Sequence, residues 1–232
     1  MKRIIFIAVV ACALWGSSAL AQNSNLSFNG SSQGKSYCGG EYGCVDTGFL
    51  DGTINGVGVG PQNSGDPGMI CDDYQKNLNN GQKWSANGID VASLNAGNIS
   101  GDTLFGKNIG LQGYAALAYL VNQMFTSSLT GSQQLAYSQA LWYISGGLNW
   151  NQLNLAAKAL VLLAELYVDK NGDSLSQYSN LWLYASKSGG GEMWGRVSVP
   201  EGGTVAGYLL LTMASCMAAM LLRNRSRAAH RI

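Results

Sequence analysis

Histidine is nearly absent from this chain of 232 residues, because its one histidine, His230, lies two residues from the end. Residues 22–198 therefore hold neither a Ser-His-Asp nor a Cys-His catalytic arrangement, and no histidine ligand for zinc. The tetrapeptide Gly172-Asp173-Ser174-Leu175 spells an esterase box. Without a histidine to activate Ser174, we interpret this segment as a turn.

Charge is also scarce, since Asp, Glu, Lys and Arg make up 12% of the residues. Residues 22–199 carry 8 Lys or Arg against 12 Asp or Glu, a net charge of −4. No basic patch is visible, which argues against a nucleic-acid partner. The acidic run Asp169-Lys170-Asn171-Gly172-Asp173 resembles the start of a calcium loop. Ser174 stands where that loop needs glycine and Asn180 where it needs a bidentate glutamate, so we expect no metal and no cofactor.

The first residues have the features of an export signal. Met1-Lys2-Arg3 is a charged start, Ile4 to Leu14 is apolar, and Ser17-Ser18-Ala19-Leu20-Ala21 offers small residues for cleavage. This order predicts a secretory signal peptide over residues 1–21, cut after Ala21. The alternative, an uncleaved membrane helix, is less favoured because the apolar run is short.

The last residues predict a membrane segment. The apolar run Val205 to Leu222 has 18 residues and no charge, and Arg223, Arg225 and Arg227 follow it. As a helix it would be about 27 Å long, close to the roughly 30 Å of a bilayer's hydrocarbon core. The arginines are expected to stay in the cytoplasm.

A short motif precedes that run, as Val199-Pro200-Glu201-Gly202-Gly203. The order of motif, helix and arginines over residues 199–232 resembles the PEP-CTERM sorting signal of Gram-negative bacteria. In that family a proline usually follows the Pro-Glu pair, and Gly202 holds its place here. The resemblance implies processing by an exosortase-type enzyme after transient anchoring in the inner membrane, and then a place at the cell surface or outside the cell. The alternative is a plain C-terminal anchor.

The cysteines between these two ends are odd in number. Cys12 and Cys216 lie in the apolar terminal runs, which leaves Cys38, Cys44 and Cys71 for an oxidising compartment. Glycines between Cys38 and Cys44 let the chain double back, so a local disulfide is expected. Cys71 is then left as a buried thiol, an intermolecular disulfide or a modified residue.

Hydrophobic periodicity gives the layout of residues 37–198, after a polar Ser/Asn/Gly stretch over residues 22–36 that predicts a flexible arm. Short strands are expected first, with Met69 to Tyr74 and residues 82–91 joined by a hairpin turn at Asn79-Asn80-Gly81. Three helices follow, over residues 112–126, 133–145 and 151–168. The first is expected to carry the apolar stripe Ala115, Leu117, Ala118, Leu120, Val121, Met124 and Phe125. The third is expected to bury Leu153, Ala156, Ala157, Leu160, Val161, Leu163 and Ala164. Closing strands are expected at residues 181–184 and 193–199. We therefore predict an α+β domain, an antiparallel β-sandwich or barrel-like sheet with three inserted helices, plus the C-terminal transmembrane helix.

Two of these pieces carry a second resemblance. The strand contains Ile70-Cys71-Asp72-Asp73, and a helix 68 residues later contains Tyr137-Ser138-Gln139-Ala140-Leu141-Trp142. The ordered pair resembles the thioester domains of bacterial surface adhesins, which combine Tyr-Cys-Val/Ile-Asp with Thr-Gln-x-Ala-Ile-Trp. Ile70, Ser138 and Leu141 replace the Tyr, Thr and Ile, while the Gln, Ala and Trp are kept.

The resemblance implies an internal thioester. The thiolate of Cys71 would attack the side-chain carbonyl of Gln139 and expel ammonia. Ser138 would polarise that carbonyl, and Tyr74 or Trp142 would shield the bond from water. An amine or hydroxyl on a target would then be acylated by Gln139 once, which makes the protein a covalent adhesin or cross-linker and no turnover enzyme.

Simpler interpretations stand beside this one. Gln139 and Trp142 suit an ordinary helix, and Cys71 suits a buried thiol, which leaves a passive component of the envelope or polysaccharide matrix. A hydrolase would need a carboxylate pair such as Asp72 or Asp73 with Glu165, which no pattern brings together. Four tryptophans are expected in or around the core in preference to a carbohydrate site: Trp84, Trp150, Trp182 and Trp194.

Overall fold

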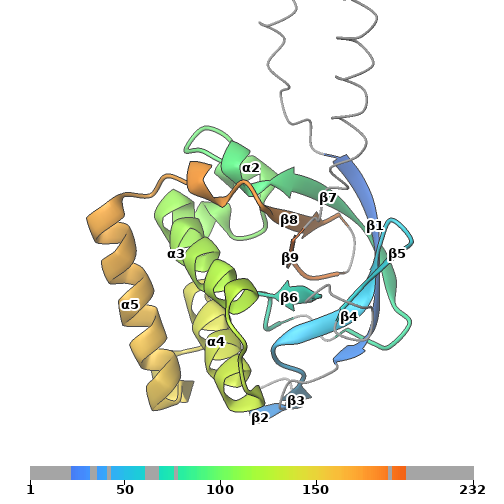
Figure 1. The fold of residues 1–232 in the computed structure, drawn as a ribbon, viewed down its shortest axis with the longest axis horizontal. Coiled ribbons are helices and arrows are strands. Elements are labelled where there is room, and N and C mark those ends of the chain that lie inside the picture. The colour runs from blue at the N-terminus through green and yellow to red at the C-terminus, as the bar shows by residue number, and fades with distance from the viewer. Residues whose placement is uncertain are drawn as a thin grey trace, which may run out of the picture. The chain divides into compact units, whose positions relative to one another are not determined.

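Six antiparallel strands form a barrel-like sheet in the computed structural model, which describes residues 22–31, 36–40, 43–60, 68–75, 78–187 and 190–196 (Figure 1). The strand order is β1-β7-β8-β9-β6-β4, and β4 also pairs with β1, which closes the ring. These strands are β1 (Gln22–Ser31), β4 (Phe49–Ile54), β6 (Met69–Cys71), β7 (Lys83–Asp90), β8 (Leu181–Ser186) and β9 (Met193–Arg196). The predicted α+β class with a barrel-like antiparallel sheet is confirmed.

Three short strands lie outside the ring. β5 (Val57–Val59) forms a hairpin with β4, and Asn55 and Gly56 take positive φ angles of 52° and 81° at its turn. β2 (Tyr37–Gly40) and β3 (Gly43–Val45) make a separate two-stranded sheet. The expected disulfide between Cys38 and Cys44 joins these two strands, and Cys71 is a free cysteine.

The helical group is inserted between β7 and β8, as the change of hydrophobic period predicted. It consists of a short helix and three long ones: α2 (Ile99–Asp102), α3 (Gly106–Thr126), α4 (Gly131–Ile144) and α5 (Leu155–Asn171). Thr130 begins α4 with a reciprocal capping box to Gln133, and the Asn154 side chain caps the first turn of α5. Figure 1 shows α3 and α4 between the barrel and α5. Of the described helices, none has the length and apolar character to cross a bilayer.

Two hydrophobic clusters follow from the alternation of side chains along the strands. Ile70 and Trp194 pack with the helices, whereas Met69 and Met193 pack inside the barrel, where Cys71 contacts their cluster. The seven residues expected to form the buried stripe of α3 are all buried: Ala115, Leu117, Ala118, Leu120, Val121, Met124 and Phe125. The site residue Cys71 therefore lies on the barrel side of β6.

Three expectations need correction. Residues 22–31 of the predicted flexible arm form β1, because Leu26 and Phe28 supply the buried face that pairs with β4 and β7. The turn at Asn79-Asn80-Gly81 forms, but it does not join a hairpin, since β7 pairs with β1 and β8. On α5, Ala156 and Leu163 were expected to be buried and are exposed.

Several predicted segments lie outside the described residues. These are the signal peptide over residues 1–21 and the sorting signal over residues 199–232, with its membrane helix over residues 205–222. The motif residues Val199, Pro200 and Glu201, and the arginines Arg223 and Arg225, belong to the second of these segments.

Candidate functional site around Cys71

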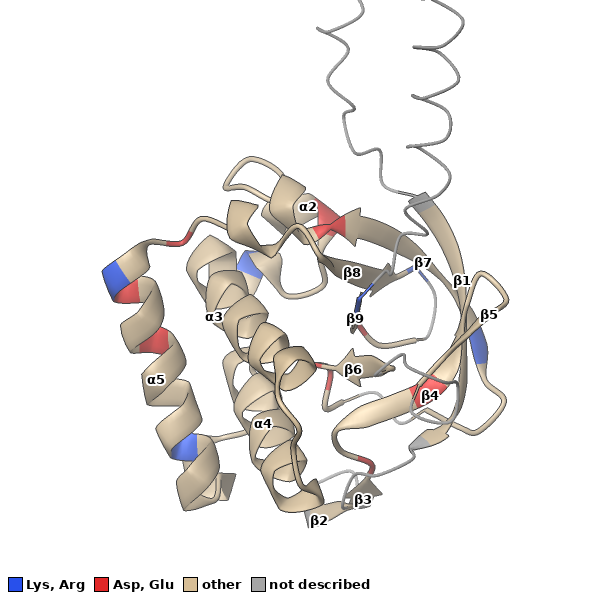
Figure 2. Ribbon diagram, viewed as in Figure 1, with Lys and Arg blue, Asp and Glu red and all other residues tan. Residues whose placement is uncertain are grey.

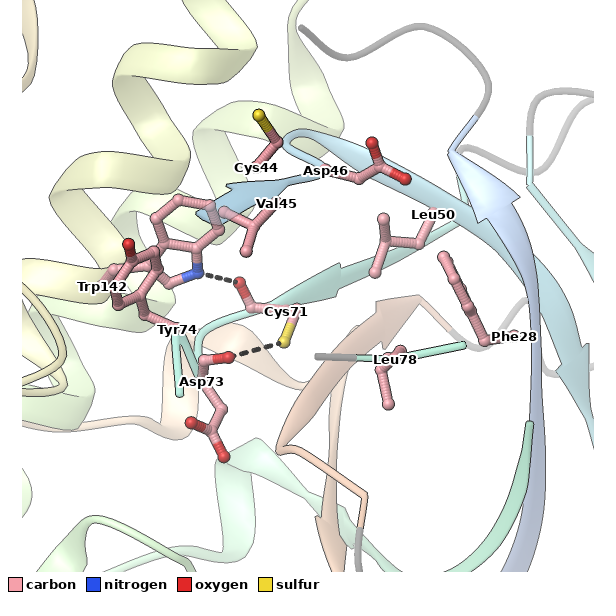
Figure 3. A pocket seen from close by; sticks show the side chains of 10 residues that line it. All are labelled: Phe28, Cys44, Val45, Asp46, Leu50, Cys71, Asp73, Tyr74, Leu78 and Trp142. Atoms are coloured by element: carbon pink, nitrogen blue, oxygen red, sulfur yellow. Dashed lines mark hydrogen bonds between the residues drawn. The ribbon is translucent and has the colours of Figure 1, made fainter. Parts of the chain in front are cut away.

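A small cavity of about 110 Å³ lies beside Cys71 (Figure 3). It is lined by Phe28, Cys44, Val45, Asp46, Leu50, Cys71, Asp73, Tyr74, Leu78 and Trp142. The Cys71 thiol donates a 3.4 Å hydrogen bond to the backbone carbonyl of Asp73. Figure 3 shows the sulfur of Cys44 directed away from Cys71. Cys71, which is half-buried as a residue, thus contributes its thiol to a pocket of mixed character.

The surroundings of this sulfur favour the thiol over the thiolate. Burial raises the pKa of Cys71 well above its ordinary value, and the negative charges of Asp73 and Asp72 raise it further. A thiolate is the nucleophilic form, so these surroundings lower the reactivity of the Cys71 sulfur at neutral pH.

The structure brings the two motif segments together through Trp142. The indole nitrogen of Trp142 donates a 3.0 Å hydrogen bond to the backbone carbonyl of Cys71. The ring of Tyr74 packs against that indole, with the ring centroids 5.1 Å apart. Both aromatic residues line the Cys71 cavity.

Gln139 does not line this cavity. Its side chain is buried on α4, and its Oε1 accepts a 3.3 Å hydrogen bond from the backbone N–H of Asn154, at the start of α5. The Cys71 side chain packs with the barrel cluster on the other side of β6 from the helices. The two groups that a thioester would join are therefore directed toward different elements.

Ser138 occupies the neighbouring face of α4. Its Oγ accepts a 2.8 Å hydrogen bond from the backbone N–H of Gly48, just before β4. Gly48 has φ of +81°, and a Cβ there would lie 2.1 Å from Oε1 of Gln134. The close approach of α4 to β4 therefore depends on glycine at this position, with Ser138 satisfying its N–H.

The spacing of the helical motif explains these directions. In Thr-Gln-x-Ala-Ile-Trp the glutamine lies four residues before the tryptophan, whereas Gln139 lies three before Trp142 and Ser138 lies four before it. One residue on an α-helix turns the side chain by about 100°. Ser138 consequently faces the sheet, and Gln139 is turned toward α5.

Two buried carboxyl groups meet next to Cys71, and the sequence pattern did not predict this pair. Asp72 follows Cys71 in the chain, and Glu192 precedes Met193, the residue that pairs with Cys71 in β9. Asp72 and Glu192 are fully buried and close enough for the charge of Glu192 to raise the pKa of Asp72. Oδ2 of Asp72 accepts a 2.7 Å hydrogen bond from the Trp194 indole. Oε1 of Glu192 accepts a 2.5 Å hydrogen bond from the Tyr114 hydroxyl, and Oε2 accepts one of 2.9 Å from the Leu104 N–H.

Two carboxyl groups that are buried close together cannot both ionise without a large cost in free energy. Burial raises the pKa of Asp72 well above its ordinary value, and the charge of Glu192 raises it further. Burial also raises the pKa of Glu192, to about 7, against hydrogen bonds that lower it. Both shifts favour the protonated form of this pair of carboxyl groups. The only sequence signal was two acidic residues directly after a buried strand, since Glu192 comes 120 positions later.

The other residue groups considered in the sequence analysis do not come together as a site in the structure. Glu165 lies exposed on α5, in a groove with Gln112 and Asp169, away from the Asp72 pair. Trp84 and Trp194 are buried, Trp182 packs at the edge of the barrel cluster, and Trp150 is 37% exposed. Within the described part of the chain, no three His, Cys, Asp or Glu side chains form a metal-binding group.

Comparison with protein-family models, with curated proteins and with solved structures finds no match to this chain.

Proposed function

We propose that this protein is an exported component of the cell surface or extracellular matrix that works as a folded structural module, with Cys71 kept as a thiol. Its export rests on the signal peptide over residues 1–21, and its sorting on the motif, apolar run and arginines over residues 199–232. The partner in processing is an exosortase-type enzyme, and the membrane is a transient anchor. No catalytic turnover is assigned.

One observation carries the choice of a module without a reactive bond. The carbonyl oxygen of Gln139 is engaged by Asn154 at the start of α5, while the Cys71 thiol points into the barrel cavity. Acyl transfer would need these groups at near-attack distance, with the thiol ionised. The raised pKa of Cys71 opposes that ionisation.

A covalent adhesin or cross-linker is the second candidate, with an amine- or hydroxyl-bearing target. The hydrogen bond from Trp142 to Cys71 favours this second candidate, because it joins the two segments that resemble the thioester motif. The packed rings of Tyr74 and Trp142 also lie beside the cysteine. A Cys71–Gln139 thioester would require the Gln139 side chain to leave Asn154 and turn toward the sheet.

Intact mass separates the two candidates. The exported protein should match its sequence mass after allowance for the Cys38–Cys44 disulfide, and Cys71 should alkylate as soon as the protein is unfolded. A mass lower by one ammonia, restored by methylamine with a methylated amide on Gln139, would establish the thioester. Cys71→Ala and Gln139→Ala are matched controls, since each must abolish any genuine deficit.

A further inference from the structure

The outer face of α5 carries a continuous row of exposed apolar side chains. Leu155 is 85% exposed, Leu162 56% and Leu166 49%, and exposed Ala159 lies between the first two. Leu163, 48% exposed, lies beside this row. Exposed apolar residues are ordinary when scattered, but a row along one helix is typical of a surface that another molecule covers.

The spacing of this row is that of a helix-pairing seam. Leu155, Ala159, Leu162 and Leu166 are separated by four, three and four residues, the repeat that brings apolar side chains into the contact of two paired helices. The opposite face of α5, with Ala157, Val161, Ala164 and Val168, is already buried against the domain. α5 therefore has two apolar faces, and its own domain uses one.

The position of α5 leaves the seam accessible. Figure 1 shows α5 as the outermost helix of the group, on the far side of α3 and α4 from the barrel. Figure 2 shows that α5 also carries charged positions, whereas α4 carries none. Two of these charges are Lys158 and Glu165, which are seven residues apart and flank the seam on one side.

We propose that two copies of the domain form a symmetric dimer in which α5 packs antiparallel against α5 of the second copy. Centred between Ala159 and Leu162, the two-fold axis places Leu155 opposite Leu166 and Ala159 opposite Leu162. Lys158 of each copy then faces Glu165 of the other, which gives two equivalent ion pairs. This arrangement covers the apolar row with an identical row.

Charge favours antiparallel over parallel pairing. In a parallel pair, Lys158 would face Leu163 of the second copy, and its charge would be unpaired. In the antiparallel pair, the ion pairs lie on one flank, and Ala156 meets Leu163 on the other. Trp150 lies beside Lys158, whose Nζ is 5.4 Å from the ring centroid, and extends the apolar surface there.

The short seam sets the strength of this dimer. A helix of 17 residues is about 25 Å long, so the contact is small for a stable interface. We expect a weak dimer, with a dissociation constant on the order of micromolar. The proposed dimer does not depend on whether Cys71 and Gln139 form a thioester.

Cysteine cross-linking tests the pairing on the full chain. Two copies with different epitope tags, one Ala159→Cys and the other Leu162→Cys, are expressed together with the natural signal peptide and oxidised. A disulfide-linked dimer with both tags is expected. Ala159→Cys paired with Lys170→Cys is the misaligned control, and the unaltered chain controls for Cys71.

Charge reversal tests the register. Lys158→Glu should weaken dimerisation of the full chain in detergent roughly tenfold, because like charges then meet on both sides of the axis. Lys158→Glu combined with Glu165→Lys should restore it, although the double variant also lacks the Lys158–Trp150 contact. Sedimentation over a concentration series gives the dissociation constants. The proposal is overturned if the doubly tagged dimer is absent, or if the double variant dimerises as weakly as the single one. It is also overturned if the protein is a monomer whose seam is covered by lipid or by its own apolar C-terminal run.

Discussion

Trp142 holds Cys71 by its backbone, since the indole nitrogen donates a 3.0 Å hydrogen bond to the Cys71 carbonyl. The bond joins α4 to β6 and so connects the helical group to the barrel where the cavity opens. It also places an aromatic wall beside the thiol without directing the side chain of Gln139 toward it.

Trp142→Phe tests the structural part of this contact. The phenyl ring keeps most of the packing with Tyr74 but removes the donor, so the free energy of unfolding should fall by about 1–2 kcal/mol. Urea unfolding of the exported protein measures this loss. Trp150→Phe is the control, because Trp150 is 37% exposed and Trp142 is buried. Equal stability of the two variants would contradict the role given to Trp142.

Ser138→Ala should destabilise the domain. The variant leaves the backbone N–H of Gly48 buried without its acceptor, at a cost of about 1–3 kcal/mol. Ser174→Ala, at an exposed hydroxyl, should stay within about 0.5 kcal/mol of the unaltered protein. If both substitutions are neutral by urea unfolding, the hydrogen bond to Gly48 contributes no stability.

The Asp72–Glu192 pair should make the domain more stable in mild acid than in base. The folded pKa of Glu192 is about 7 against an ordinary 4.5, and that of Asp72 is also raised. The folded state therefore holds protons that the unfolded chain has released above pH 4.5. Stability should fall as the pH rises from 5 to 8, by about 1.4 kcal/mol per pH unit for each extra proton held.

Glu192→Gln isolates this effect. A glutamine oxygen still accepts from Tyr114 or Leu104 but carries no titrating proton, so the fall in stability with rising pH should become less steep. The part that comes from the buried Asp72 carboxyl should remain. Glu165→Gln, at an exposed position on α5, should leave the pH dependence unchanged. Urea midpoints at pH 5, 6, 7 and 8 supply the comparison. A midpoint that rises with pH in the unaltered protein would reverse the sign and refute the assignment.

If the C-terminal sorting signal is cleaved, a tag at the C-terminus should be lost from the mature protein. An epitope placed after His230 should be present on the newly made chain and absent from the mature surface or extracellular form. Immunoblots of the membrane and external fractions, with a second tag after Ala21, follow both ends of the molecule. Persistence of the C-terminal tag on the mature protein would favour the plain anchor.

Local patterns were enough to predict much of the fold. The apolar stripe of residues 112–126 predicted α3 and its buried residues, because a helical face repeats every 3.6 residues wherever it packs. The close spacing of Cys38 and Cys44 with intervening glycines predicted their disulfide. β1 was missed because its polar residues alternate with few apolar ones, and only pairing with β4 and β7 makes it a strand.

By itself, the sequence determined the α+β layout, the inserted helices and the unpaired Cys71, since each depends on neighbours along the chain. Only the tertiary structure decided which groups meet. Asp72 and Glu192 come together because β6 and β9 are adjacent in the barrel. Gln139 faces Asn154 because one residue of spacing turns a helical side chain by about 100°. The face of α5 left exposed was likewise set by how α5 packs on its domain, which no periodicity specifies when both faces are apolar.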